Sequence, residues 1–210
     1  MKVGNAKIEV IMGKTGIGKT TYLALLSRKA IKKNIKVYSN VEIAGTHKID
    51  AKLDIGMYEI KDAVVIIDEG AIEYNNRNWK NFNERLVKYF SYHRHYRTHI
   101  IVSIQHFDGL DVTIRRLAHS IYILQPTIIP YHVKIKKVGS SIDIDDEGSI
   151  VQKYYYIHWL LFGTRYYYKV PAWSMFDTHS REDLPYKDFP LWGEYNVKRW
   201  KDILIKRQKY

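Results

Sequence analysis

Cysteine is absent from the 210 residues of this chain. Its absence excludes a disulfide framework, a cysteine-ligated zinc site and a cysteine nucleophile. Long apolar runs are also missing, since no stretch of about 18 apolar residues that could form a transmembrane helix occurs. The polar start, residues 1–7, does not have the shape of a secretory signal peptide. These absences are compatible with a protein of a reducing cytoplasm.

Acidic residues are scarce relative to basic ones. The chain has 22 Asp and Glu against 34 Lys and Arg, which gives a formal net charge of +12. A surplus of this size indicates a polyanionic partner, either nucleic acid or an anionic membrane surface. The alternative is a basic protein whose charge only keeps it dispersed. Hydrophobic residues at 46% and charged residues at 27% are typical of a globular domain.

Apolar runs and segments of helical periodicity alternate through the first two thirds of the chain. Strands are expected at residues 7–12, 35–39, 63–67, 100–104 and 121–124, and helices at residues 20–33, 79–96 and 112–118. The last helix has two candidate N-caps, Asp108 and Asp111. Buried strands that alternate with helices predict an α/β fold with a central, mostly parallel sheet covered on both faces.

The pattern changes after Pro126. Residues 131–136 and parts of 150–157 and 165–170 alternate polar and apolar residues, which is typical of antiparallel strands with one wet face. We interpret them as a β-hairpin extension of the same domain. The tyrosines of residues 154–156 and 166–168 are expected in the hairpin core, with a subunit interface as the less favoured alternative. The predicted organisation is one domain over residues 1–180, with a core at 5–126, a β-rich extension at 127–172 and a basic tail at 181–210.

One motif carries specific chemistry. Residues 13–20, Gly-Lys-Thr-Gly-Ile-Gly-Lys-Thr, match G-x-x-x-x-G-K-[ST] between a predicted strand and a predicted helix. In such a loop, backbone N–H groups cradle phosphate oxygens and the start of the helix adds positive charge. Lys19 is expected at the β/γ-phosphates, and the Thr20 hydroxyl at Mg²⁺. The candidate nucleotide-binding residues are Gly13, Thr15, Gly16, Ile17, Gly18, Lys19, Thr20 and Thr21.

An apolar strand ending in two acids completes the expected site. Residues 64–67 are followed by Asp68 and Glu69. Asp68 is expected to hold Mg²⁺, and Glu69 to orient the water that attacks the γ-phosphate. The adjacent acids and the lack of a guanine-reading N/T-K-x-D signal favour ATP. Gln105, at the end of the 100–104 strand, is expected to sense the γ-phosphate or position water.

Further short motifs accompany this site in a fixed order. They are Ser39-Asn40-Val41, Ile66-Ile67-Asp68-Glu69, His93-Arg94-His95, Ile104-Gln105, Ile114-Arg115, Tyr168-Lys169 and Met175-Phe176-Asp177-Thr178. Over roughly residues 5–180, the sequence resembles the zonular occludens toxin (Zot)-like ATPases. These are the morphogenesis ATPases of filamentous phages, within the FtsK/HerA packaging superfamily.

The resemblance implies a RecA-like fold, ATP hydrolysis with Mg²⁺, a homo-oligomeric ring and movement of viral DNA during virion assembly. Filamentous-phage members carry a transmembrane segment after the core, which this sequence lacks. We therefore expect a packaging motor of the host cytoplasm, associated with the virion or peripheral at a membrane. It would dock on a capsid or membrane protein. The basic tail is expected to dock on DNA, on anionic lipid or on a capsid vertex. The alternative is a solvated terminal helix.

Hexameric ATPases commonly complete the site with an arginine from the neighbouring subunit. Arg94 and Arg115 are the leading candidates by their place in the family pattern, ahead of Arg97 and Arg116. Each could instead form an ordinary surface ion pair. The segment 88–99 also interleaves basic and tyrosine residues. It either tracks a DNA backbone or combines core tyrosines with a solvated charged face.

Another class of function stays open. Lys14 lies five residues before Lys19, the spacing of the signature lysine in partition-type ATPases, although those carry glycine where this chain has Thr15. A nucleotide-gated switch that positions DNA or a membrane is therefore the alternative to a motor. A helicase loader of the AAA+ type is disfavoured by the β-rich stretch 131–170. A small-molecule kinase is disfavoured by the acidic pair and the basic charge.

Overall fold

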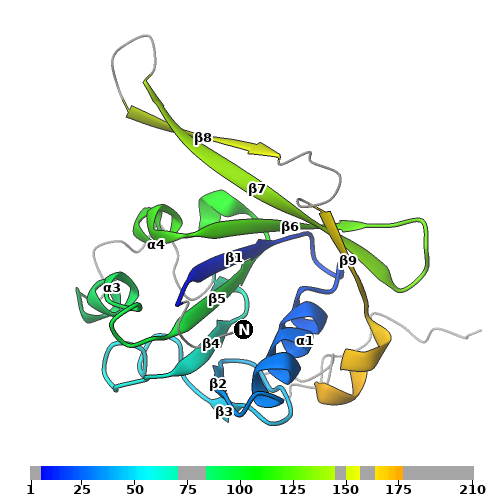
Figure 1. Ribbon diagram of the computed structural model, residues 1–210, viewed down its shortest axis with the longest axis horizontal. Helices are drawn as coiled ribbons and strands as arrows, with labels where there is room; N and C mark the ends of the chain where they lie inside the picture. Colours follow the sequence, from blue (N-terminus) through cyan, green and yellow to red (C-terminus); the bar gives the residue numbers. More distant parts are fainter. Residues whose placement is uncertain (1–5, 71–83, 145–149, 157–163, 177–210) are drawn as a thin grey trace, which may run out of the picture. The chain divides into compact units, whose positions relative to one another are not determined.

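The computed structural model describes residues 6–70, 84–144, 150–156 and 164–176. Within these residues, nine strands form one sheet in the order β3-β2-β4-β5-β1-β6-β7-β8, and β9 pairs with β7 (Figure 1). The first six strands are β1 (Ile8–Met12), β2 (Lys36–Ser39), β3 (His47–Lys48), β4 (Ala63–Ile67), β5 (His99–Ile104) and β6 (Ser120–Pro126). All pairings among these six are parallel, which confirms the predicted α/β class with a mostly parallel sheet.

The helices cover the two faces of this sheet. They are α1 (Lys19–Ile31), α3 (Glu84–Ser91) and α4 (Val112–Leu117), with 3₁₀ turns at Phe107–Gly109 and Val170–Met175. Side chains alternate along β1, so Ile8 and Val10 join one buried cluster while Ile11 joins the other, which contains residues of α1. Because parallel strands are buried on both faces, β4 is apolar and buried at every position.

One sequence prediction differs from the structure in detail, and one choice that the sequence left open is decided. The helix expected over 79–96 ends at Ser91, and turns occupy residues 92–97. The chain reverses there, with a positive φ at Arg97 and a hydrogen bond from the Thr98 amide to the His93 carbonyl, so that β5 can begin. For α4, the Asp111 side chain accepts a hydrogen bond from the Thr113 amide at 2.7 Å, so Asp111 is the N-cap.

The extension continues the same sheet. Strands β7 (His132–Ile144), β8 (Ile150–Tyr156) and β9 (Thr164–Tyr168) are antiparallel to their neighbours. Residues 133–136 of β7 pair with both β6 and β9, so these two strands flank β7 on opposite edges. The expected β-hairpin is the β7–β8 pair, and β9 is a further strand that sequence reasoning did not separate from it.

The prediction that the tyrosines of residues 154–156 and 166–168 form hairpin core is wrong for Tyr155, which is 53% exposed, and for Tyr166 and Tyr168. Tyr166 and Tyr168 are 61% and 44% exposed, whereas Tyr167 is buried. The reason is the two-residue repeat of a strand, which turns neighbouring side chains to opposite faces. The predicted basic tail, 181–210, lies outside the described residues, and the domain boundary stays a prediction. Within the described ranges, no helix has the length and hydrophobicity of a membrane span.

Candidate nucleotide-binding site

The loop of residues 13–20 lies where β1 ends and α1 begins. Its first amide, Gly13 N–H, donates to the Ile104 carbonyl of β5 at 3.2 Å, which fixes the loop to the neighbouring strand. Gly18 has φ +108°, and a β-carbon there would lie 2.9 Å from the Tyr167 hydroxyl oxygen. Gly18 therefore needs both the left-handed conformation and the missing side chain that only glycine provides. Thr21, in the first turn of α1, is buried.

Lys19 is held inside the loop by protein groups. Its ammonium donates to the Gly13 carbonyl at 3.1 Å and lies 3.7 Å from a Glu69 carboxylate oxygen. Only 6% of the residue is exposed. A buried lysine in the first turn of a helix, next to a glycine-rich loop, is suited to bind a phosphate oxygen.

The acidic strand end meets the loop through one short contact. The Thr20 hydroxyl donates to Oδ2 of Asp68 at 2.6 Å. The other carboxylate oxygen, Oδ1, accepts from the Ser103 hydroxyl and from the Glu69 amide. Hydroxyl and carboxylate oxygens are the ligands that Mg²⁺ takes from proteins, together with substrate phosphates and waters. Thr20 and Asp68 therefore fit a magnesium ion that is also coordinated by nucleotide.

Glu69 has an unusual backbone conformation, with φ of +51°. This conformation costs a non-glycine residue about 1–3 kcal/mol and is concentrated at functional sites. The Glu69 amide donates to Asp68 Oδ1 and to the Ser103 hydroxyl, at 3.0 and 3.3 Å. The side-chain amide of Gln105 lies 3.3 Å from both Glu69 carboxylate oxygens. The carboxylate is thus positioned from two sides, by Gln105 and by Lys19.

A polar chain of contacts runs across the site. The Thr15 hydroxyl donates to Gln105 Oε1 at 3.0 Å, and Gln105 in turn donates to Glu69. The loop, the end of β5 and the end of β4 are therefore connected by side chains. Lys14, the basis of the partition-type alternative, is exposed, while its neighbour Thr15 takes part in this chain of contacts. The Ile17 amide closes the loop by donating to the Lys14 carbonyl at 3.2 Å.

Two residues that sequence reasoning left without a role position Asp68. The Asn40 side chain makes a pair of hydrogen bonds with the Asp68 backbone, accepting from its N–H at 2.8 Å and donating to its carbonyl at 3.0 Å. Ser103 is fully buried in the otherwise apolar end of β5. A polar residue buried in such a strand needs a partner, and this pattern was the signal that could have identified it.

The extension also contacts the loop. The Tyr167 hydroxyl of β9 donates to the Gly18 carbonyl at 2.7 Å, and its ring lies 5.0 Å from that of Tyr22 in α1. Burial raises the pKa of Tyr167 well above its usual range, and it raises that of Tyr22 to about 12. Both phenols therefore stay protonated at neutral pH. The stem of Lys169 packs against Gly18 as well.

The arginine candidates lie away from this cluster. Arg94 is 2.6 Å from His119 Nε2, next to the start of β6 and hence at the edge where the parallel strands begin. The loop lies at the other edge, where they end.

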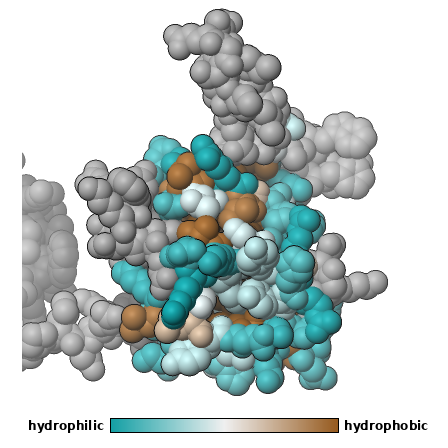
Figure 2. Space-filling model, turned by 90° about the vertical axis from the view of Figure 1, so that its left-hand side faces the viewer, coloured by the Kyte–Doolittle hydropathy of each residue, from teal (hydrophilic) through white to brown (hydrophobic). Residues whose placement is uncertain are grey.

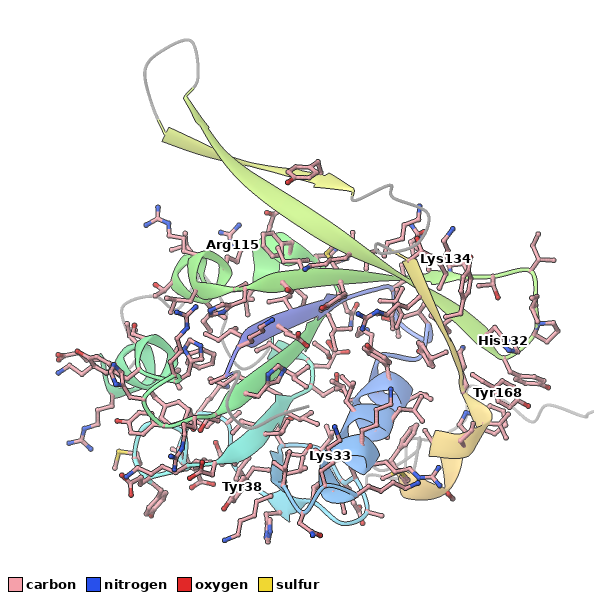
Figure 3. The ribbon with its side chains drawn as sticks, in the orientation of Figure 1. Lys33, Tyr38, Arg115, His132, Lys134 and Tyr168 are labelled. Atoms are coloured by element: carbon pink, nitrogen blue, oxygen red, sulfur yellow. The ribbon has the colours of Figure 1, made fainter. Side chains whose placement is uncertain are left out.

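Figure 2 faces the side on which α3 and α4 lie, and hydrophilic residues cover most of its coloured surface. Arg115 lies on α4 (Figure 3). Its guanidinium is 3.4 Å from an Asp108 carboxylate oxygen and lies over the Phe107 ring. Neither arginine joins Lys19 in its own subunit.

Several polar side chains of the 88–99 segment have partners within the subunit. Lys88 pairs with Glu84, Arg97 with Asp62 and His99 with Glu9. Tyr89 is buried and stacks on Tyr96 at 5.2 Å. These contacts favour a core position for Tyr89 and a paired polar face over a DNA-tracking helix, although Tyr92 is 51% exposed.

Comparisons with known proteins identify the family and the fold of the chain. The sequence profile of the family described as "Zonular occludens toxin (Zot)" matches residues 26–157, more than half of the chain. The crystal structure of the N-terminal domain of zonular occludens toxin from Neisseria meningitidis has a TM-score of 0.57 at 18% identity. The match covers 82% of this chain and 99% of that one.

A second solved structure is the genome packaging NTPase B204 from Sulfolobus turreted icosahedral virus 2, in complex with ATP-gammaS. It has a TM-score of 0.48 at 15% identity, and the match covers 72% of this chain and 98% of that one. No curated protein sequence matches the chain significantly. The likeness to the Neisseria domain is one of fold, and it agrees with the predicted α/β class with a mostly parallel sheet.

Proposed function

The chain belongs to the zonular occludens toxin family, and we propose that it is an ATP-hydrolysing motor that moves viral DNA during virion assembly. The observation that carries this proposal is the convergence of Lys19, Thr20, Asp68 and Glu69 around one glycine-rich loop. A phosphate-binding loop alone supports nucleotide binding. A carboxylate held next to its lysine adds the group that hydrolysis requires.

The proposed reaction uses each of these residues in one role. The amides of residues 13–20 and Lys19 would bind the β- and γ-phosphates of ATP. Thr20 and Asp68 would hold Mg²⁺, which when bound neutralises charge on the phosphate oxygens. Glu69 would accept a proton as the water oxygen forms its bond to the γ-phosphorus. The bond from that phosphorus to the bridging oxygen of ADP breaks, which yields ADP and phosphate.

Gln105 and Thr15 would report the state of the γ-phosphate. Both lie on the contact chain between the loop and Glu69. Loss of the γ-phosphate would therefore free Gln105 and Thr15 to change their contacts. An arginine from a neighbouring copy, Arg94 or Arg115, would complete the site in a homo-oligomeric ring. The edge location of Arg94 beside His119 is compatible with contact to another subunit. We place this motor in the host cytoplasm, docked on a capsid or membrane protein.

The test is ATP binding and turnover by the purified chain. We expect Lys19→Ala to lose ATP binding, and Glu69→Gln to retain it while turnover falls by about two orders of magnitude or more. Lys14→Ala serves as the control within the same loop and should leave turnover intact. Unchanged turnover in Glu69→Gln would remove Glu69 from its role.

Assembly distinguishes the motor from the partition-type switch. Mass measurement with an ATP analogue and DNA should give a ring larger than a dimer, unaffected by Lys14→Ala. A nucleotide-dependent dimer that dissociates in Lys14→Ala would favour the switch instead.

A further inference from the structure

The outer face of β7 and β9 carries a set of basic and aromatic side chains. Antiparallel register places His132 opposite Tyr168, Lys134 opposite Tyr166 and Lys136 opposite Thr164. Directly paired residues share a face, so these positions lie on one side of the sheet. We call His132, Lys134, Lys136, Tyr166 and Tyr168 the β7–β9 face.

The other side of the same strands is core. Val133, Ile135 and Tyr167 are buried in the cluster that contains residues of α1. The outward rings do not share this burial, since Tyr166 is 61% and Tyr168 44% exposed. Figure 3 shows His132, Lys134 and Tyr168 along the same pair of strands. Tyr166 and Tyr168 therefore add little to the buried core.

The geometry suits a strand of unpaired nucleotides. Tyr166 and Tyr168 are two residues apart on one strand, so their attachment points are about 7 Å from each other. The Tyr168 ring is supported by the His132 ring at 5.0 Å. Exposed aromatic rings stack on bases of any sequence, and neighbouring lysines bind the phosphates. Bases in a duplex already stack on one another and leave no free face for a tyrosine.

We propose that the β7–β9 face binds single-stranded nucleic acid. The charge of the chain, +12, complements a polyanion. The 88–99 segment, the rival surface, pairs Lys88, Arg97 and His99 with carboxylates of its own subunit. The proposal rests on the proposed function, because it names the surface and the kind of nucleic acid that the motor contacts.

The position of this face links it to the nucleotide site. Tyr166 and Tyr168 flank Tyr167, whose hydroxyl binds the Gly18 carbonyl of the phosphate loop. One strand therefore presents two side chains to the bound nucleic acid and one to the loop. A shift of β9 along its length would act on both sites.

The experiment is fluorescence anisotropy with a labelled oligodeoxythymidine and with a labelled duplex, using the full chain. We expect the double variant Tyr166→Ala/Tyr168→Ala to raise the Kd for the single strand about tenfold or more. The Kd for the duplex should change less than about twofold. Lys134→Ala should reduce the slope of log affinity against log salt by about 0.7. Matched controls are Tyr58→Ala/Tyr92→Ala, also exposed tyrosines, and Lys36→Ala.

Three outcomes overturn the proposal. The single-strand Kd could be unchanged in the tyrosine variant, or duplex affinity could fall equally. The variant could also change only the oligomeric state, which would make the face a contact between copies of the chain. ATP binding by the same variant is measured in parallel. Retained ATP binding with unchanged DNA binding refutes this surface alone, whereas a wild-type chain that binds no ATP refutes the proposed function.

Discussion

The Thr20 hydroxyl and Oδ2 of Asp68 lie 2.6 Å apart, so the first turn of α1 is hydrogen-bonded to the end of β4. These two residues are 48 positions apart in sequence, and parallel strand order brings them together. The contact joins the two halves of the site that would share a magnesium ion. Its removal should affect metal-dependent binding more than stability.

Replacing Thr20 by Ala tests this pairing. We expect the magnesium-dependent part of ATP binding to be lost, while the free energy of unfolding falls by only about 1 kcal/mol, the typical worth of one hydrogen bond. Calorimetric titration with ATP, with magnesium and with a chelator, measures the first effect. Thr46→Ala removes another threonine hydrogen bond, to the Ile43 carbonyl, and should leave magnesium dependence unchanged. Equal magnesium dependence in both variants would contradict the assignment.

Asn40 should be important for stability as well as for activity. Its side chain satisfies both backbone groups of Asp68, so Asn40→Ala leaves two partly buried polar groups without that partner. We expect a loss of about 1–3 kcal/mol in the free energy of unfolding, measured by urea denaturation. Asn40→Asp keeps the acceptor but not the donor, so its free energy of unfolding should lie between those of Asn40→Ala and the wild type. A variant as stable as the wild type would show that water replaces the amide.

Tyr167 connects the extension with the phosphate loop. Tyr167→Phe keeps the buried ring and removes only the hydroxyl that binds the Gly18 carbonyl. We expect ATP affinity to fall several-fold, because the loop loses a contact that fixes its backbone. Tyr89→Phe is the matched control, since its buried hydroxyl binds the Ile60 carbonyl on another part of the chain. If both variants lower ATP affinity equally, the contact acts on general stability and not on the loop.

Acid should destabilise the fold through two histidines at the edge where the strands begin. Burial lowers the pKa of His93. The nearby Arg94 and His99 lower it further, whereas the hydrogen bond with the Phe90 carbonyl opposes the shift. Burial also lowers the pKa of His119. Smaller contributions in the same direction come from the charges of His93, Arg94, Lys7 and His99. The Ile8 amide also donates to Nδ1 of His119, a bond that protonation of Nδ1 would break.

The sign of the pH dependence follows from these directions. A histidine with a lowered pKa in the folded state takes up protons more readily when unfolded. Stability is therefore full above about pH 6.5, the unfolded value, and falls as the pH drops toward the folded pKa values. Urea denaturation between about pH 7.5 and pH 5 should show this decline. His119→Gln should reduce it, and a decline of equal size in that variant would assign it to other groups.

Much of the fold followed from local patterns. The apolar residues of β4 and β5 predicted buried parallel strands. The glycine-rich loop between β1 and α1 predicted a phosphate-binding site. The pattern did not separate the end of α3 at Ser91 from the following turns, because Tyr92 and Tyr96 continue the helical period. Nor did it detect β3, His47–Lys48, whose two residues are too few to form a pattern.

The sequence by itself determined the chemical groups of the site, since Lys19, Thr20, Asp68 and Glu69 lie in motifs whose spacing is local. Only the tertiary structure decided what surrounds them. Asn40, Ser103 and Tyr167 reach the site through strand order and register, which depend on pairings between residues far apart in sequence. The same register turned Tyr166 and Tyr168 outward and Tyr167 inward. A one-residue slip would have reversed all three.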